Sequence, residues 1–125
     1  LEVFDHAECA FIAAYRREGA AEAVDVQLEY VSAPPVTGRI LILCDPMLAS
    51  GTSMLRSLEA MEKNGKPRAV HVAAIFASQP GIAALQRSRP DVQIWTAAVD
   101  PELNSRSYIV PGLGDAGDLA FGEKL

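Results

Sequence analysis

The chain has 125 residues, of which 50% are hydrophobic and 22% are charged. This length allows one compact domain, and the balance of apolar and charged residues argues against long disorder. The formal net charge of −5 argues against a general nucleic-acid binder. The apolar runs, such as Val70 to Ala77, are far too short to cross a bilayer, so we expect neither a nucleic-acid nor a membrane partner.

Two features bear on location and completeness. Cys9 and Cys44 lie inside apolar runs without CxxC spacing, so we expect reduced core cysteines in a cytoplasmic protein. The first residues do not form a signal peptide, and the chain starts at Leu1 without a methionine. We therefore expect a single domain over residues 1–125 that is incomplete at its N-terminus.

The first predicted elements form a β-arm. Residues 9–15 are a short apolar run typical of a buried strand. Residues 24–31 alternate apolar and polar side chains, which indicates a strand with one face in water. Pro34 and Pro35 follow, and neither can donate to a strand ladder, so we expect the arm to span residues 18–35.

Strands and helices alternate along the rest of the chain. Residues 39–44 are a continuous apolar run, which predicts a parallel strand covered on both faces and ended by Asp45-Pro46. The remaining elements are predicted in order as a helix over 52–63, a strand over 69–77, a helix over 80–87 and a strand over 92–99. Trp95 in the last strand is expected in the core or at an interface. This order predicts an α/β fold with a mostly parallel sheet flanked by helices.

The loop from Asp45 to Ser53 joins the first of these strands to its helix. In open α/β sheets, ligands bind beyond the carboxyl ends of the strands. Free N–H groups at the helix start, with the hydroxyls of Ser50 and Thr52, favour an anion there. This pattern indicates a phosphate site with a carboxylate at its edge. The same residues could do no more than cap the helix, and the loop alone leaves both interpretations open.

Two motifs carry a resemblance to a known family. The run Ile40 to Gly51 (ILILCDPMLASG) resembles the phosphoribosyl-pyrophosphate (PRPP) motif of uracil phosphoribosyltransferases. The run Tyr108 to Asp118 (YIVPGLGDAGD) resembles the uracil-binding segment of that family. Shorter matches between them keep the family's order and spacing, so the resemblance covers essentially the whole chain. Where the family usually has Thr-Gly-Gly, this chain has Ser50-Gly51-Thr52, and Thr52 would restrict the loop if its position required a positive φ.

The resemblance implies a type I phosphoribosyltransferase fold, which is Rossmann-like, and an enzyme of pyrimidine salvage. Such an enzyme transfers ribose 5-phosphate from PRPP to N1 of uracil, giving UMP and pyrophosphate. The implied cofactor is Mg²⁺, bound through PRPP and water without a direct protein ligand. The resemblance also implies a homodimer or higher homo-oligomer, with the β-arm at the dimer contact and able to close over the site.

The resemblance also assigns site residues. Asp45 would accept hydrogen bonds from the ribose hydroxyls and Asp115 would help to position PRPP, so these two carboxylates are the catalytic candidates. Arg16 would also contact PRPP. The rest of the PRPP site, with its residues 49–53 at the 5′-phosphate, would be Pro46, Met47, Leu48, Ala49, Ser50, Gly51, Thr52 and Ser53. Uracil would be bound mainly by main-chain groups of Ile109, Gly114, Asp115 and Ala116.

Two alternatives stay open. One is a regulatory protein on the same fold that binds PRPP or UMP without turnover, since family members carry their pyrophosphate-binding loop in a longer N-terminal part. The other is a transferase for a different base, such as a purine. Uracil- and PRPP-dependent UMP formation tests the first alternative, and a base-competition assay tests the second.

Overall fold

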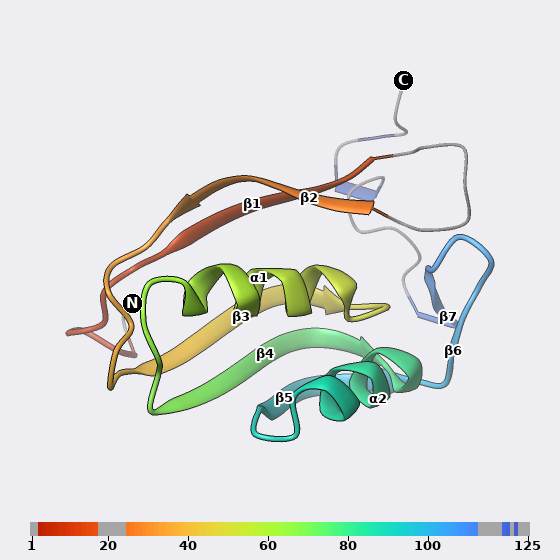
Figure 1. Cartoon of the computed structure of the whole chain (residues 1–125). Helices are drawn as coiled ribbons and strands as arrows, with labels where there is room; N and C mark the ends of the chain where they lie inside the picture. Colours follow the sequence, from red (N-terminus) through yellow and green to blue (C-terminus); the bar gives the residue numbers. More distant parts are fainter. Residues whose placement is uncertain (1–2, 18–24, 113–118, 121, 123–125) are drawn as a thin grey trace.

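Two strand–helix–strand units form the centre of the structure, a computed structural model that describes residues 3–17, 25–112, 119–120 and 122. Strands β3 (Ile40–Leu48), β4 (Ala69–Ser78) and β5 (Gln93–Asp100) pair in parallel, in the order β3-β4-β5. Helices α1 (Thr52–Glu62) and α2 (Gln79–Ser88) connect them (Figure 1). The predicted α/β fold with a parallel sheet is confirmed.

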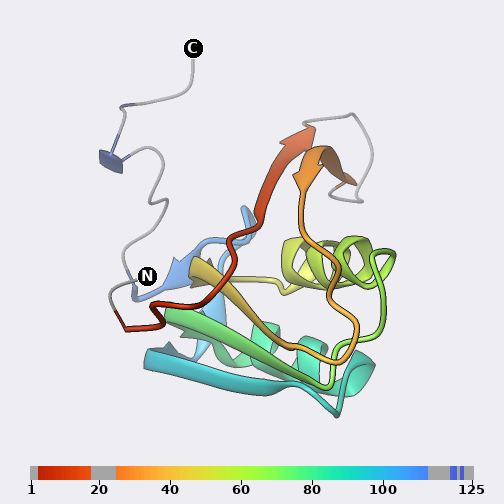
Figure 2. The ribbon, with the colours of Figure 1, turned by 90° about the vertical axis from the view of Figure 1, so that its left-hand side faces the viewer.

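Both helices lie on one face of this sheet (Figures 1 and 2). Right-handed crossovers that step in one direction across a sheet place their helices on the same side. Side chains from alternate strand positions point to this face and pack with the helices into one core, whose members include Leu41, Met54, Leu58, Met61, Val70, Val72, Ala74 and Leu85. Among the described residues, no helix has the length and apolar character needed to cross a bilayer.

The opposite face of the sheet carries apolar side chains that remain in contact with solvent. Ile42 is 41% exposed, Ile75 is 56% exposed and Trp95 is 60% exposed. Cys44 is also exposed, and it shares a register row with Ala73 and Trp95. The expectations of a strand covered on both faces and of a buried Cys44 are therefore wrong for the described residues. Trp95 was expected in the core or at an interface, and the core position is wrong. The cause is the topology, because both crossovers pass on the other side.

The predicted arm is a two-stranded antiparallel hairpin of β1 (Phe11–Arg17) and β2 (Asp25–Ser32). It lies along the outer side of α1, away from the sheet (Figure 1). The end of the hairpin at which β1 finishes and β2 starts points toward the same end of the molecule as the carboxyl ends of the parallel strands (Figure 1). Cys9 precedes β1 and is exposed, so its predicted burial in a strand is wrong. Residues 18–24 of the predicted arm lie outside the described residues.

A short antiparallel pair follows β5. It consists of β6 (Glu102–Leu103) and β7 (Ile109–Val110). The side-chain oxygen of Asn104 closes the turn between them by accepting hydrogen bonds from the N–H groups of Arg106 and Tyr108, at 2.9 and 3.0 Å. The pair lies beyond the carboxyl end of the sheet (Figure 1). The segment predicted to bind a base therefore starts on the same side of the molecule as the loop after β3.

Candidate active site

The loop from Asp45 to Ser53 lies at the carboxyl edge of the sheet, where β3 passes into α1. The strand does not end at Asp45-Pro46 as predicted, since β3 continues to Leu48 alongside β4. Proline has no N–H to donate to a neighbouring strand. Because β3 is an edge strand of the described sheet, it can contain Pro46 without losing a hydrogen bond to β4. Asp45 is therefore held on a regular strand and not on an irregular turn.

A cavity of about 230 Å³ lies against this loop. It is lined by Asp45, Pro46, Met47, Leu48, Ala49, Ser50, Gly51, Ser53 and Met54. Every residue of the predicted PRPP loop except Thr52 is among them. The structure therefore brings these predicted residues together around one hollow at the carboxyl edge of the sheet, which is where α/β proteins bind ligands.

The start of α1 offers N–H groups without a strong protein acceptor. Gly51 is the N-cap residue and adopts the left-handed conformation, with φ 81° and ψ −11°. No side chain of the described residues caps the helix. The hydroxyl of Ser50 accepts only a long hydrogen bond of 3.4 Å from the N–H of Thr52, and it donates to Thr52 Oγ1 at 3.2 Å. These groups stand at the positive end of the helix dipole, which favours an anion.

Thr52 replaces a glycine of the family pattern without backbone strain. It is the first residue of α1, and within the loop the positive φ belongs to Gly51. The condition under which Thr52 would restrict the loop, a positive φ at its position, is therefore not met. Its hydroxyl is paired with Ser50 instead.

Asp45 is the charged side chain of the cavity lining. Its Oδ1 accepts a hydrogen bond from the N–H of Met47 at 2.9 Å, which fixes the direction of the carboxylate. The residue is half-buried at the cavity edge. Within the described part of the chain, its second oxygen has no hydrogen-bond partner. A carboxylate held in this way can accept hydrogen bonds from the hydroxyl groups of a ligand.

The turn between β4 and α2 supports this loop from behind. Ser78 is 0% exposed and its hydroxyl bonds to the carbonyl of Ala49. Gly81 lies so close to Ala49 that a Cβ on Gly81 would stand 2.0 Å from the Ala49 carbonyl oxygen. Sequence reasoning did not assign either residue to the site. The sequence does place a serine directly before a helix start that contains proline. This pattern predicts that the serine caps the helix, but it does not reveal which other segment the serine contacts.

The other predicted site residues fall partly outside the described chain. Arg16 lies on β1, opposite Val26 of β2. Ile109 lies on β7 and is buried, with 1% of the residue exposed. The remaining uracil-site predictions lie outside the described residues: Gly114, Asp115 and Ala116.

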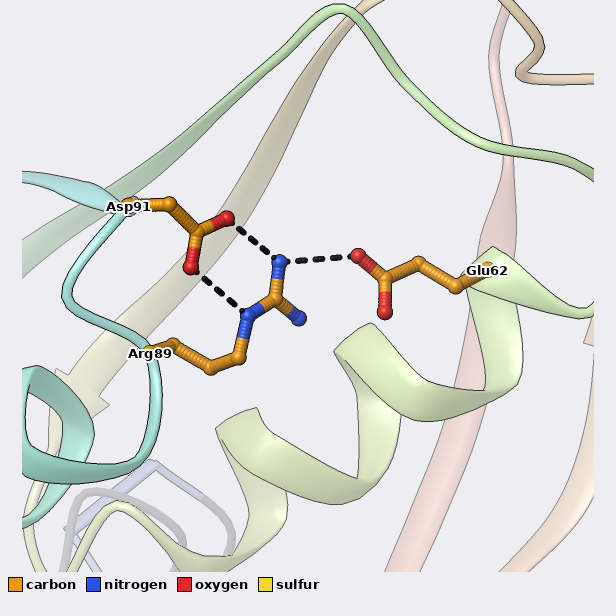
Figure 3. Close-up of polar contacts among 3 residues, drawn as sticks. All are labelled: Glu62, Arg89 and Asp91. Atoms are coloured by element: carbon orange, nitrogen blue, oxygen red, sulfur yellow. Dashed lines mark hydrogen bonds and ion pairs between the residues drawn. The ribbon is translucent and has the colours of Figure 1, made fainter.

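The clearest pKa shifts among the described residues belong to a cluster away from this loop. Arg89 donates from Nε and Nη2 to the two carboxylate oxygens of Asp91, at 3.0 and 2.8 Å, and from Nη2 to Glu62 at 2.8 Å (Figure 3). The hydrogen bonds to Asp91 and then Glu62 raise the pKa of Arg89, and those from Arg89 lower the pKa of Asp91. Because Glu62 is the last residue of α1, the cluster stands at the end of the helix opposite the loop. It ties the two helical units together and takes no part in the site.

The fold and this loop define the class of α/β proteins whose candidate ligand site lies at a helix N-terminus beyond a parallel strand. The sequence profile described as Uracil phosphoribosyltransferase matches residues 1–123, and the chain belongs to that family.

Individual proteins that are similar to this chain include several with names from the same family. The uracil phosphoribosyltransferase of Porphyromonas gingivalis is 47% identical over 126 residues, which cover 100% of this chain and 58% of that protein. The uracil phosphoribosyltransferase of Pyrococcus furiosus is 40% identical, with 100% and 53% covered. The structure of the AQ2163 protein from Aquifex aeolicus has a TM-score of 0.88 at 30% identity, covering 99% of this chain and 58% of that one. The chain therefore spans somewhat more than half the length of these relatives.

Proposed function

We propose that this chain serves the uracil phosphoribosyltransferase reaction of pyrimidine salvage, in which PRPP and uracil give UMP and pyrophosphate. The bond between C1′ and the pyrophosphate oxygen breaks, a bond between C1′ and uracil N1 forms, and the N1 proton leaves. The observation that carries this proposal is the anchored carboxylate of Asp45 beside an uncapped helix start in one cavity. The names of the relatives support it.

The start of α1 would hold the 5′-phosphate. Residues 49–53 contribute backbone N–H groups, and Ser50 and Ser53 contribute hydroxyls at the cavity. Fixed donors of this kind need no rearrangement when the dianion binds, which makes them effective in a protein with a net charge of −5. A phosphate gripped at this point leaves the ribose extending toward Asp45.

Asp45 would bind the ribose hydroxyls of PRPP. As the pyrophosphate departs, the ribose gains positive charge, as in glycoside chemistry, and a nearby carboxylate stabilises that charge. Because Oδ1 is already bonded to the N–H of Met47, the carboxylate is oriented before the substrate arrives. We propose Asp115 as the second carboxylate of the site, on the evidence of the motif that contains it.

Uracil would be bound by main-chain groups after β7. Peptide donors and acceptors can match the alternating edge of uracil, and cytosine would leave buried groups unpaired. The matching peptide groups are assigned to Gly114, Asp115 and Ala116 by their motif.

The residues at the cavity fit a Mg²⁺ ion that enters with PRPP. The ligands of the ion would come from PRPP and water, and the carboxylate of Asp45 at the cavity edge could hold such a water molecule without binding the ion directly. When bound, Mg²⁺ supplies countercharge for the departing pyrophosphate.

We also propose a homodimer or higher homo-oligomer in the cytoplasm. The hairpin supports the oligomer, since Phe11 and Tyr30 are 65% and 58% exposed and form a tilted aromatic pair with 6.5 Å between ring centroids. Exposed aromatic pairs of this kind are common in protein interfaces.

Nucleotide binding and turnover test the proposed function. We expect saturable binding of UMP by calorimetry, much weaker binding of CMP, and UMP formation from PRPP, uracil and Mg²⁺. The relative from Porphyromonas gingivalis serves as the positive control for turnover. Equal binding of UMP and CMP would contradict the assignment to uracil, and the absence of UMP binding would contradict the proposed site. UMP binding without pyrophosphate release would favour a regulatory protein instead.

A further inference from the structure

We infer that Ser78 is the positioning residue of the proposed phosphate loop, residues 49–53, and that its buried hydroxyl aims the N–H of Ser50 at the 5′-phosphate. This inference rests on the phosphate-binding role proposed above. Ser78 lies on a different strand from the loop and is not part of the cavity lining. It would therefore act on the ligand only through the loop backbone.

One hydroxyl joins three segments of the fold. Ser78 Oγ donates a hydrogen bond of 2.6 Å to the carbonyl oxygen of Ala49, and it accepts one of 2.9 Å from the N–H of Gly81. Ser78 ends β4 and caps α2 in an extended conformation, with φ −97° and ψ 148°. It is 0% exposed, so water cannot substitute for either partner. The loop after β3 is thus bonded to the start of α2.

The bond to Ala49 determines the direction of a peptide group. In a trans peptide unit, the C=O of one residue and the N–H of the next point in opposite directions. Because the Ala49 carbonyl is held toward Ser78, the N–H of Ser50 points away from Ser78. Ala49, Ser50 and Gly51 line the cavity and Ser78 does not, so this N–H points to the cavity side of the loop.

The surrounding backbone leaves the loop little freedom to move. A Cβ on Gly81 would stand 2.0 Å from the Ala49 oxygen, and a Cβ on Gly51 would stand 3.1 Å from the Gly81 oxygen. The first turn of α2 therefore contacts the loop at both its carbonyl side and its N-cap residue. Anion binding by fixed N–H donors is sensitive to small displacements of those donors. A displacement of the backbone at this contact would therefore change the affinity for the anion.

Ribose 5-phosphate affinity tests the role of Ser78. Ser78→Ala removes both hydrogen bonds and leaves the Ala49 carbonyl without its partner, so we expect the affinity for ribose 5-phosphate to fall about tenfold. The affinity for uridine, which has no phosphate, should stay unchanged. Ser78→Thr keeps the hydroxyl and should restore ribose 5-phosphate binding. A loss for both ligands would indicate general destabilisation and would overturn the inference.

Ser57→Ala is the matched control. Ser57 is also a buried serine, 8% exposed, but it lies in the middle of α1, and its hydroxyl makes no hydrogen bond to residues 45–53 within the described chain. We expect this variant to bind ribose 5-phosphate like the unmodified chain. If the unmodified chain itself binds no ribose 5-phosphate, the proposed function fails. If it binds and Ser78→Ala binds equally well, only the inference about Ser78 fails.

Hydrogen exchange gives a second test that needs no variant. The N–H of Gly81 is bonded to Ser78 and is linked to the loop through that hydroxyl. We expect ribose 5-phosphate to slow the exchange of the Gly81 amide several-fold, because an ordered loop holds Ser78 in place. Unchanged exchange at saturating ligand would overturn the inference even if Ser78→Ala does not fold.

Discussion

Gly51 combines two constraints that no other residue type meets at its position. Its φ of 81° lies in the left-handed region, and an added Cβ would stand 3.1 Å from the Gly81 oxygen. Left-handed backbone costs a residue with a Cβ about 1–2 kcal/mol. The conformation of residues 49–53, the proposed phosphate loop, therefore depends on the absence of a side chain here.

Gly51→Ala should lower both stability and phosphate affinity. We expect a loss of about 1–2 kcal/mol in the free energy of unfolding, measured with urea, and weaker binding of ribose 5-phosphate by calorimetry. Gly38→Ala is the control, because Gly38 has a φ of 71° but open space around its Cβ position. The control should lose stability and keep its affinity. Equal affinity in both variants would show that the loop tolerates the change.

Asp45→Asn should weaken ribose binding while leaving the fold intact. An asparagine keeps the oxygen that accepts the hydrogen bond from Met47, but it loses the negative charge. We expect a melting temperature close to that of the unmodified chain and an affinity for PRPP or UMP about tenfold lower. Calorimetry and a thermal melt measure the two effects separately. A large drop in melting temperature would assign Asp45 a structural role instead.

At the scale of secondary structure, the sequence predicted an element correctly where local apolar patterns determine its position. The helix over Thr52–Glu62 and the strand over Ala69–Ser78 lie where apolar periodicity predicted them. The end of β3 was mispredicted because Pro46 normally stops a strand, and only the sheet order reveals an edge strand that tolerates it. The contact between Ser78 and Ala49 joins residues 29 positions apart, which no local pattern reveals.

The cluster around Arg89 should stabilise the joint between α1 and α2 in a pH-dependent way. The folded state lowers the pKa of Asp91, so its contribution is present above the pKa of the unfolded chain, near 3.8, and is lost as the pH falls through the lower folded value. Because Asp91 is 58% exposed, we expect a contribution of about 1 kcal/mol or less.

Thermal melts of Asp91→Asn against the unmodified chain measure this contribution. The difference in melting temperature should be largest near neutral pH and should shrink in acid. Glu59→Gln is the control, since Glu59 makes a single exposed 3.5 Å pair with Arg56. It should change the melting temperature little at any pH. A difference for Asp91→Asn that persists in strong acid would contradict the electrostatic explanation.

At the scale of the whole molecule, the position of the site followed from a general rule about parallel sheets. The loop after β3 and the start of the second motif after β5 both lie beyond carboxyl ends of parallel strands, so their placement at one edge could be predicted from strand order. The solvent exposure of the second face of the sheet could not be predicted from strand order. The run at residues 39–44 is apolar on both sides, which predicts two covering layers, yet the described chain provides one.

That bare face also contains the sole tryptophan of the chain, which turns Trp95 into an optical reporter. We expect its emission to resemble that of an indole in water and to be quenched readily by acrylamide. Any polypeptide that binds to the exposed surface of β4 and β5 would shift the emission of Trp95 to shorter wavelength and shield the indole ring from the quencher. Emission that is already blue-shifted and shielded in dilute solution would show that this surface is covered before any partner is added.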